Sequence, residues 1–271
     1  MITNSKFLNV IGAIFFGAFT AGAQAVPVDL STWTAEGGGG SWLVQAGGDA
    51  VLQQVNTTTP TVFYDGNTLS QGQALNGNIT VQTTSDDDFI GFVLGYTAAG
   101  GIGDAVTDFF LVDWKQGNQV NAGVLGEAGI AISHVTNGLA TFDDFWSHNS
   151  AAGVTEIAEG NNLGSTGWAD NTAYAFNILF TDQLIQVSVN NILELSIDPN
   201  DVAGISSFSD GSFGFYNMSQ QSVLYSSITQ VDCNQTPSAP ECHQADVPEP
   251  GTLALLCLGL LGTVAARTRV K

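Results

Sequence analysis

Basic residues are nearly absent from this sequence. The chain of 271 residues has 25 Asp+Glu against 5 Lys+Arg, a formal net charge of −20. Four of the five bases lie in the first seven or last five positions, so residues 26–247 hold 24 of the 25 acids but a single base, Lys115. Binding to nucleic acid or to anionic lipid needs a basic surface that neutralises phosphates. The composition therefore excludes both kinds of partner.

Charged residues are scarce altogether, at 11% of the chain, whereas 44% are hydrophobic and 10% aromatic. A disordered chain has the opposite balance, with much charge and few aromatic side chains. About 220 residues between the two ends are enough for one large core, so we expect a single folded domain.

The N-terminus lacks an apolar run long enough to span a membrane. Lys6 precedes apolar residues 7–19, and Ala23-Gln24-Ala25 follows. A short basic region, a short apolar stretch and an A-x-A site are typical of a secretory signal peptide. We expect a signal helix within residues 1–25 and cleavage after Ala25; the alternative is a buried N-terminal helix.

The C-terminal apolar run is also short. Pro248-Glu249-Pro250 precedes 16 apolar residues, 251–266, and a basic end. Sixteen helical residues span roughly 24 Å, less than a bilayer core of about 30 Å. Residues 247–271 resemble the PEP-CTERM sorting segment. The resemblance implies a Gram-negative bacterium that makes exopolysaccharide, and processing by an exosortase-type membrane enzyme. The chain would then contact the membrane only through this short transmembrane helix; the alternative is an ordinary anchor.

The chain has only 3 cysteines. Cys233 and Cys242 lie nine positions apart just before the sorting segment, and in an oxidising compartment we expect a disulfide between them rather than two free thiols. Cys257 lies in the apolar tail. No C-x-x-C pair or Cys/His cluster indicates zinc.

No stretch between the two ends shows a sustained helical period. Turn clusters instead separate short runs rich in β-branched and aromatic residues, several of them alternating in polarity. Asn190-Asn191 between two such runs predicts a tight hairpin, since Asn tolerates positive φ. The thirteen runs predict an all-β sandwich of two sheets; they cover residues 42–44, 51–55, 61–64, 78–83, 89–96, 109–114, 130–135, 154–157, 174–180, 184–189, 192–197, 212–216 and 223–228.

Several blocks, in order, resemble the thrombospondin C-terminal domain over residues 33–234. The clearest are SDDDFIGFVLGY at 85–96, FFLVDWKQ at 109–116 and GWADNTAY at 167–174. The resemblance implies a jelly-roll, concanavalin-like sandwich over residues 26–234, related to L-type lectins, that binds calcium and acts in extracellular adhesion. Residues 235–246 would be a linker. Residues 100–108 are an insertion relative to the family, and its many basic residues are absent.

Asp86-Asp87-Asp88 is the strongest chemical feature. Adjacent carboxylates repel one another, and Ca²⁺, which takes six to eight oxygen ligands, relieves the repulsion. The turn leads directly into a predicted strand that would hold these oxygens in place. The alternative is a solvated acidic turn. Further candidate ligands are Asp170 in its loop and the pair Asp143 and Asp144.

Aromatic side chains could stack on sugar rings. Trp168, which lies in a loop, and Tyr174, which begins a predicted strand, are the two candidates, although an aromatic residue in a strand more often belongs to the core. His134 and His148 are interpreted as surface or hydrogen-bonded core groups.

The sequence also lacks the signatures of catalysis. There is no Gly-x-Ser-x-Gly and no His-Glu-x-x-His, and Glu156 and Glu159 are expected to face opposite sides of one strand. We therefore expect no enzymatic activity. The preferred function is an exported, calcium-binding adhesion or matrix module at the cell surface, with a matrix protein or exopolysaccharide as partner. The alternatives are a lectin for that polysaccharide or, less favoured, a polysaccharide-active jelly-roll enzyme.

Overall fold

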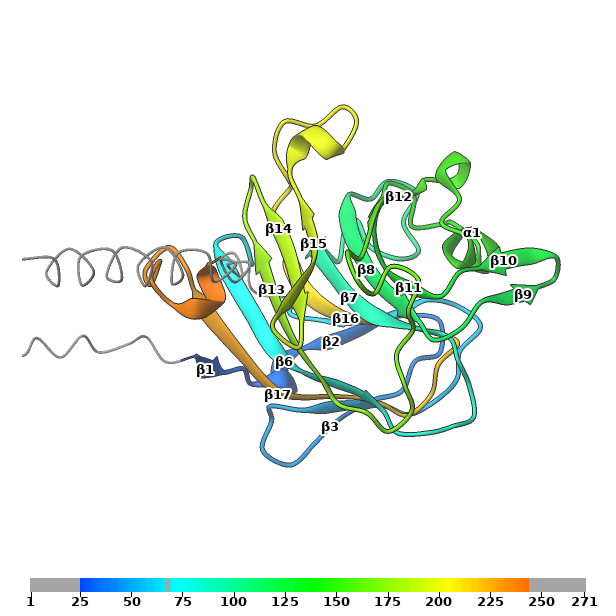
Figure 1. Cartoon of the computed structure of the whole chain (residues 1–271), viewed down its shortest axis with the longest axis horizontal. Coiled ribbons are helices and arrows are strands. Elements are labelled where there is room, and N and C mark those ends of the chain that lie inside the picture. Colours follow the sequence, from blue (N-terminus) through cyan, green and yellow to red (C-terminus); the bar gives the residue numbers. More distant parts are fainter. Residues whose placement is uncertain (1–24, 67–68, 244–271) are drawn as a thin grey trace, which may run out of the picture.

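Two antiparallel β-sheets pack face to face in the computed structural model, which describes residues 25–66 and 69–243 (Figure 1). The expected signal helix and C-terminal helix lie outside these residues, as do Ala23 and the Pro248-Glu249-Pro250 motif. Within the described residues, no helix has the length and apolar character needed to cross a membrane.

The first sheet has eight strands. In spatial order it contains β15 (Ile192–Ile197), β14 (Ile185–Val189), β13 (Tyr174–Phe180), β6 (Gln73–Val81), β17 (Val223–Asp232), β4 (Val51–Gln53) and β3 (Trp42–Val44), with β1 (Val26–Pro27) paired to β17.

The second sheet has seven strands. In spatial order it contains β12 (Val154–Glu159), β11 (Gly129–Val135), β8 (Phe109–Lys115), β7 (Phe89–Tyr96), β16 (Ser212–Met218), β5 (Thr61–Tyr64) and β2 (Thr34–Gly37). A separate hairpin, β9 (Gln119–Asn121) and β10 (Val124–Gly126), projects beside the short helix α1 (Phe142–Trp146) (Figure 1). Four 3₁₀ turns complete the described elements: η1 (Leu30–Thr32), η2 (Ser150–Ala152), η3 (Pro199–Asp201) and η4 (Pro240–Cys242).

Each of the thirteen predicted runs contributes a strand, and the all-β, two-sheet prediction is confirmed. Asn190 and Asn191 connect β14 to β15 with φ of 51° and 63°, the left-handed values that the sequence predicts for this hairpin. The strands that the sequence did not indicate are β1, β2, β9 and β10, which have two to four residues each. Runs that short carry too little alternation to be recognised.

The main core fills the space between the sheets, where alternate residues of each strand meet, for example Phe92, Phe176 and Phe215. A second core lies on the outer face of the seven-stranded sheet, where Phe145 and Trp146 of α1 pack with residues such as Phe89. Strands β7 and β8 are therefore buried on both faces. This double burial explains why their sequences are almost continuously apolar.

A β-bulge changes the expected orientation of two carboxylates in β12. Ile132 of β11 pairs with Ala158, but the next residue, Ser133, pairs with Glu156, so β12 contains one extra residue. An extra residue shifts the alternation of side chains by one position. Glu156 and Glu159 consequently line the same hollow, together with His148. The prediction that they face opposite ways is wrong.

Candidate metal centre

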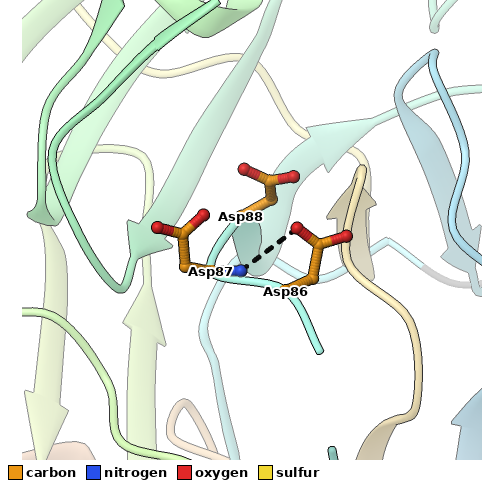
Figure 2. A group of neighbouring side chains, drawn as sticks. All are labelled: Asp86, Asp87 and Asp88. Carbon is orange, nitrogen blue, oxygen red and sulfur yellow. Dashed lines mark hydrogen bonds between the residues drawn. The ribbon is translucent and has the colours of Figure 1, made fainter. Parts of the chain in front are cut away.

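The three adjacent aspartates lie in the turn that directly precedes the central strand β7. Asp86 and Asp87 are half-buried and Asp88 is buried (Figure 2). One carboxylate oxygen from each residue lies within 4.8 Å of the other two. This is the only group of three or more acidic, histidine or cysteine side chains at such distances among residues 25–66 and 69–243.

Backbone and amide contacts fix the turn. The Asp88 amide donates to Gln220 Oε1 at 3.0 Å, and the Asp87 amide donates to Asp86 Oδ1 at 3.2 Å. The Asn56 side-chain amide donates to Asp86 Oδ2. The turn is therefore held between the segment after β4 and the segment after β16.

The domain's single base lies inside this acidic cluster. Lys115 is fully buried, and its Nζ donates to Asp88 Oδ1 at 2.9 Å, Asp87 Oδ1 at 3.3 Å and the Asp87 carbonyl at 3.0 Å. A further hydrogen bond reaches Gln119 Oε1 at 3.0 Å. The ammonium also lies 4.6 Å from the ring centroid of Trp146, a cation–π distance. Lys115 is thus an internal counter-ion for two of the three aspartates.

One ammonium does not balance three carboxylates. Lys115 makes ion pairs with Asp87 and Asp88, and the fully ionised group has a net charge of −2. Asp86 is the acid that these ion pairs leave out. Burial, and next the charge of Asp88, raise the pKa of Asp86 to about 6. The cluster therefore carries the excess negative charge that a divalent cation would compensate.

The donor set fits a hard cation. Ca²⁺ prefers carboxylate and carbonyl oxygens and completes its shell with water. The ammonium of Lys115 contacts Oδ1 of Asp87 and Oδ1 of Asp88, not their Oδ2 atoms. Gly117 adds space, because a Cβ at this position would lie 3.2 Å from Asp87 Oδ2. Asp86, Asp87 and Asp88 would be the protein ligands of such an ion.

The other predicted ligands lie outside this group. Asp170 is linked to the aspartate turn through Gln116. The side-chain amide of Gln116 donates to Asp170 Oδ1 at 3.2 Å, and the backbone amide of Gln116 donates to the Asp87 carbonyl at 3.1 Å. Asp144 instead caps α1, where its Oδ2 accepts from the Thr141 amide at 2.8 Å. Asp143 lies in the same turn of α1 and is exposed. The structure therefore does not bring the pair into a metal site with the triplet.

Of the two sugar-stacking candidates, Trp168 is buried and Tyr174 is half-buried. Trp168 is only 2% exposed, and its indole N–H donates to the carbonyls of Asp88 and Trp114 at 3.2 and 3.1 Å. Tyr174 packs edge-on against Trp114, and its hydroxyl accepts from the Ala169 amide. The stacking hypothesis is therefore wrong for Trp168. The residue follows a loop in sequence but supports the aspartate turn from inside the core.

His134 and His148 each lie within hydrogen-bond distance of carboxylates. His134 Nε2 lies 2.7 Å from Asp108 Oδ1. His148 bridges two acids, with Nε2 3.0 Å from Asp113 Oδ2 and Nδ1 2.7 Å from Glu156 Oε2. The hydrogen bond to His148 lowers the pKa of Glu156.

Sequence reasoning missed the partners of the aspartate turn. Lys115, Gln220 and Asn56 are distant in sequence from Asp86–Asp88 and meet it only through the strand order of the sheets. One signal was present, because Lys115 is the only base in residues 26–247. When the only basic residue of an acidic domain lies at the end of a buried strand, an internal ion pair is indicated.

Comparison with known proteins gives two family matches. The thrombospondin C-terminal region matches residues 39–235, and the PEP-CTERM protein-sorting motif matches residues 246–270. Cartilage oligomeric matrix protein of Mus musculus is 24% identical over 216 residues, which cover 75% of this chain and 27% of that protein. Thrombospondin-3 of Homo sapiens is 24% identical over 207 residues, covering 72% and 20%. The chain thus spans about a quarter of the length of these curated relatives.

Solved structures with a similar arrangement of strands include carbohydrate-binding proteins. The carbohydrate binding module CBM66 from Bacillus subtilis aligns with a TM-score of 0.48 and 13% identity over 73% of this chain and 94% of that one. The exoplasmic/lumenal domain of VIP36, in its Ca²⁺/Man-bound form, aligns with a TM-score of 0.49 and 12% identity over 74% and 83%.

Proposed function

The chain belongs to the thrombospondin C-terminal family, and from this premise we propose that it is an exported, calcium-binding adhesion or matrix module. Its calcium site would be built on Asp86, Asp87 and Asp88. The observation that carries the proposal is the charge of this cluster, three carboxylates that meet a single ammonium. A divalent cation would remove the remaining repulsion and hold the turn before β7 in place.

Export is supported by the PEP-CTERM match at residues 246–270. An exosortase-type enzyme would process the tail and release the domain to the cell surface or the extracellular matrix. The partner would be a matrix protein or an exopolysaccharide. The module would act by binding, without catalysis.

Thermal unfolding of the exported protein, with excess calcium and with chelator, tests the calcium site. A ligand present at 100 times its Kd stabilises a protein by about 2.7 kcal/mol, so we expect a clearly higher midpoint with calcium. Asp86→Asn is the sharpest variant, because Asp86 makes no ion pair with Lys115 and its loss leaves the ammonium partnered. We expect it to remove most of the calcium effect.

Asp143→Asn is the matched control, an exposed acid outside the cluster that makes the same change in charge. It should keep the full calcium effect. An unchanged midpoint in the wild type would reject the calcium proposal. A full calcium effect in both Asp86→Asn and the double variant Asp87→Asn/Asp88→Asn would place the ion elsewhere.

A further inference from the structure

The hairpin formed by β9 and β10 is connected to the aspartate turn through one side chain. Lys115 ends β8, and its ammonium donates to the carboxylates of Asp87 and Asp88. The same ammonium donates to Oε1 of Gln119, the first residue of β9, at 3.0 Å. Because the Lys115 side chain is fully buried, it cannot replace any of these partners with water. One charge therefore contacts two of the proposed calcium ligands and the hairpin at the same time.

The base of the hairpin also packs against α1. Gly126 ends β10, and a Cβ at this position would lie 2.7 Å from the indole nitrogen of Trp146. The ammonium of Lys115 lies 4.6 Å from the centroid of the same Trp146 ring. Beyond this base the hairpin projects from the domain, with Val120 65% and Leu125 42% exposed (Figure 1). Lys115 and Trp146 thus hold the base of an element whose tip is exposed and apolar.

A cation at the aspartate turn would change the interactions of Lys115. The cation and the ammonium would share the carboxylates of Asp87 and Asp88, so each weakens the attraction of the other to them. A buried charge that loses partners is costly, and the ammonium cannot reach solvent. Its uncharged acceptors include Gln119 Oε1 and the Trp146 ring, which calcium does not contact. The cation therefore strengthens the interactions of Lys115 with the base of the hairpin.

We propose that Lys115 couples the calcium site to the β9–β10 hairpin, so that calcium at the aspartate turn orders the hairpin. The inference rests on the proposed calcium site and adds to it the surface that the ion controls. A ligand shifts the state of a distant element only when the interactions of that element differ between the bound and free states. The hydrogen bond from Lys115 to Gln119 is the interaction that differs here. The controlled surface is the exposed tip that carries Val120 and Leu125.

Amide hydrogen exchange of the exported protein, measured by mass spectrometry with calcium and with EDTA, tests the coupling. We expect calcium to slow exchange in residues 117–128 at least about fivefold, the lower end of the range for coupled sites. Gln119→Ala removes the hydrogen bond from Lys115 to the hairpin and leaves both ion pairs of the ammonium in place. In this variant calcium should still slow exchange at residues 85–89, but most of its effect on the hairpin should be lost.

Asn121→Ala is the matched control. It makes the same change from an amide side chain to alanine in the same strand, at an exposed position. It should keep the full effect of calcium on the hairpin.

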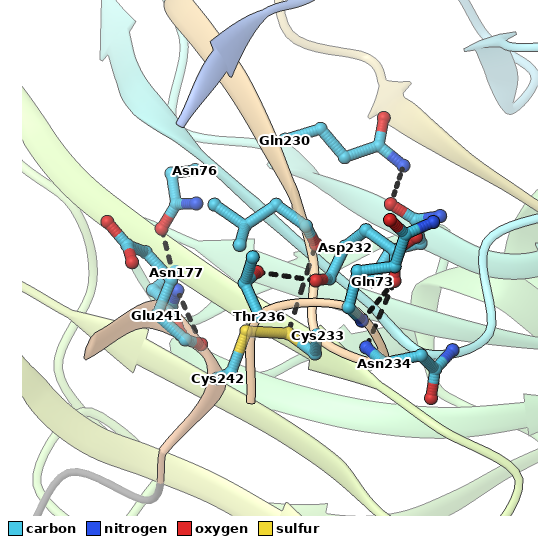
Figure 3. The surroundings of a disulfide bond; sticks show 12 residues. Gln73, Asn76, Asn177, Gln230, Asp232, Cys233, Asn234, Thr236, Glu241 and Cys242 are labelled. Atoms are coloured by element: carbon cyan, nitrogen blue, oxygen red, sulfur yellow. Dashed lines mark hydrogen bonds between the residues drawn. A yellow bond between two sulfur atoms is a disulfide. The ribbon is translucent and has the colours of Figure 1, made fainter. Parts of the chain in front are cut away.

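A reference region within the same molecule is the loop between Cys233 and Cys242. A disulfide closes this loop, as the spacing of the two cysteines predicts (Figure 3). The loop lies at the opposite end of the domain from the hairpin (Figure 1). Its exchange should not respond to calcium, so a change confined to the hairpin and the aspartate turn is distinguished from a general stabilisation.

The outcomes separate the coupling from the calcium site itself. If calcium neither raises the unfolding midpoint nor slows exchange at residues 85–89, the calcium site is rejected and the coupling with it. If calcium does both and leaves the hairpin unchanged, the calcium site stands and the coupling is overturned. The coupling through Lys115 is also overturned if calcium slows exchange in the hairpin equally in Gln119→Ala and Asn121→Ala.

Discussion

At the scale of single residues, Lys115 is the buried positive charge that pairs with two of the three aspartates. Its ammonium is fully buried between Asp87 and Asp88, and the Asp88 side chain is only 5% exposed. Removing one partner of a buried ion pair leaves the other charge without compensation and costs about 3–5 kcal/mol. We expect Lys115→Met to lower the free energy of unfolding by about this amount in chelator, and by less in calcium, since the cation supplies positive charge.

Denaturant unfolding with calcium and with chelator measures both effects. Gln119→Ala is the control, because it removes only a neutral acceptor of the same ammonium. A loss below about 1 kcal/mol for Lys115→Met would show that the aspartates are solvated and that Lys115 is not their counter-ion.

We expect His148 to make the domain less stable as the pH becomes alkaline. Burial lowers the pKa of His148, but the charge and hydrogen bond of Asp113 and the hydrogen bond of Glu156 outweigh it and raise the pKa from 6.5 to about 10. Because the pKa is raised in the folded state, the contribution of His148 to the free energy of unfolding is complete below about pH 6.5. It is lost as the pH rises through about 10. His148→Asn removes this titration, and Asn accepts the φ of 49° at this position.

Urea unfolding of the wild type and His148→Asn at intervals from pH 6 to pH 10 measures the difference. We expect the wild type to be more stable at pH 6 and the advantage to shrink toward pH 10. A difference that stays constant over this range would mean that His148 is neutral in the folded protein.

The residues that the sequence could identify are those adjacent in the chain. Asp86, Asp87 and Asp88 follow one another, so their clustering needs no knowledge of the fold. Lys115 joins them only because β8 lies beside β7 in the sheet. Trp168 was misinterpreted for the same reason, since its indole contacts Asp88 and Trp114, and these contacts depend on strand order.

At the scale of elements, alternation and turn chemistry predicted the strands well but not their irregularities. Tyr174–Phe180 and Ile192–Ile197 have the bounds that the sequence predicts. The bulge in β12 was not predictable, because its residues keep the composition of an ordinary strand. Its consequence is large, since it brings Glu156 and Glu159 to one hollow.

The loop between Cys233 and Cys242 is an element whose order depends on one covalent bond. Closing a loop of this length lowers the entropy of the unfolded chain, worth roughly 2–3 kcal/mol on the loop-closure model. We expect Cys233→Ser/Cys242→Ser to lose about this much stability and to free η4 from β6 and β13. Peptide mapping of the exported protein without reductant checks the bond itself. Two free thiols in that map would contradict the prediction.

At the scale of the whole molecule, the sequence predicted the two sheets and the one shared core but not the second core. Phe145 and Trp146 lie outside the thirteen predicted runs, yet they cover the outer face of β7 and β8. A strand whose outer face is covered by a short helix has the same apolar residue types as a strand that is buried between two sheets. The sequence therefore predicted that these strands are buried but not what buries them.

The Cys233–Cys242 disulfide lies near the end of the described residues, and the sorting motif starts a few residues after it, at residue 246. Cleavage near Pro248–Pro250 would therefore leave every described strand intact. Proline fixes φ and disfavours helix in the preceding residue, so from the sequence we expect this segment to offer an extended peptide to a processing enzyme. The 16 apolar residues that follow are fewer than the about 20 of a permanent span, and Gly259 and Gly262 weaken a helix further. We expect the tail to be temporary. Intact-mass measurement on protein extracted from the cell surface tests this, and a mass that still includes residues 253–271 would mean that the tail is a permanent anchor.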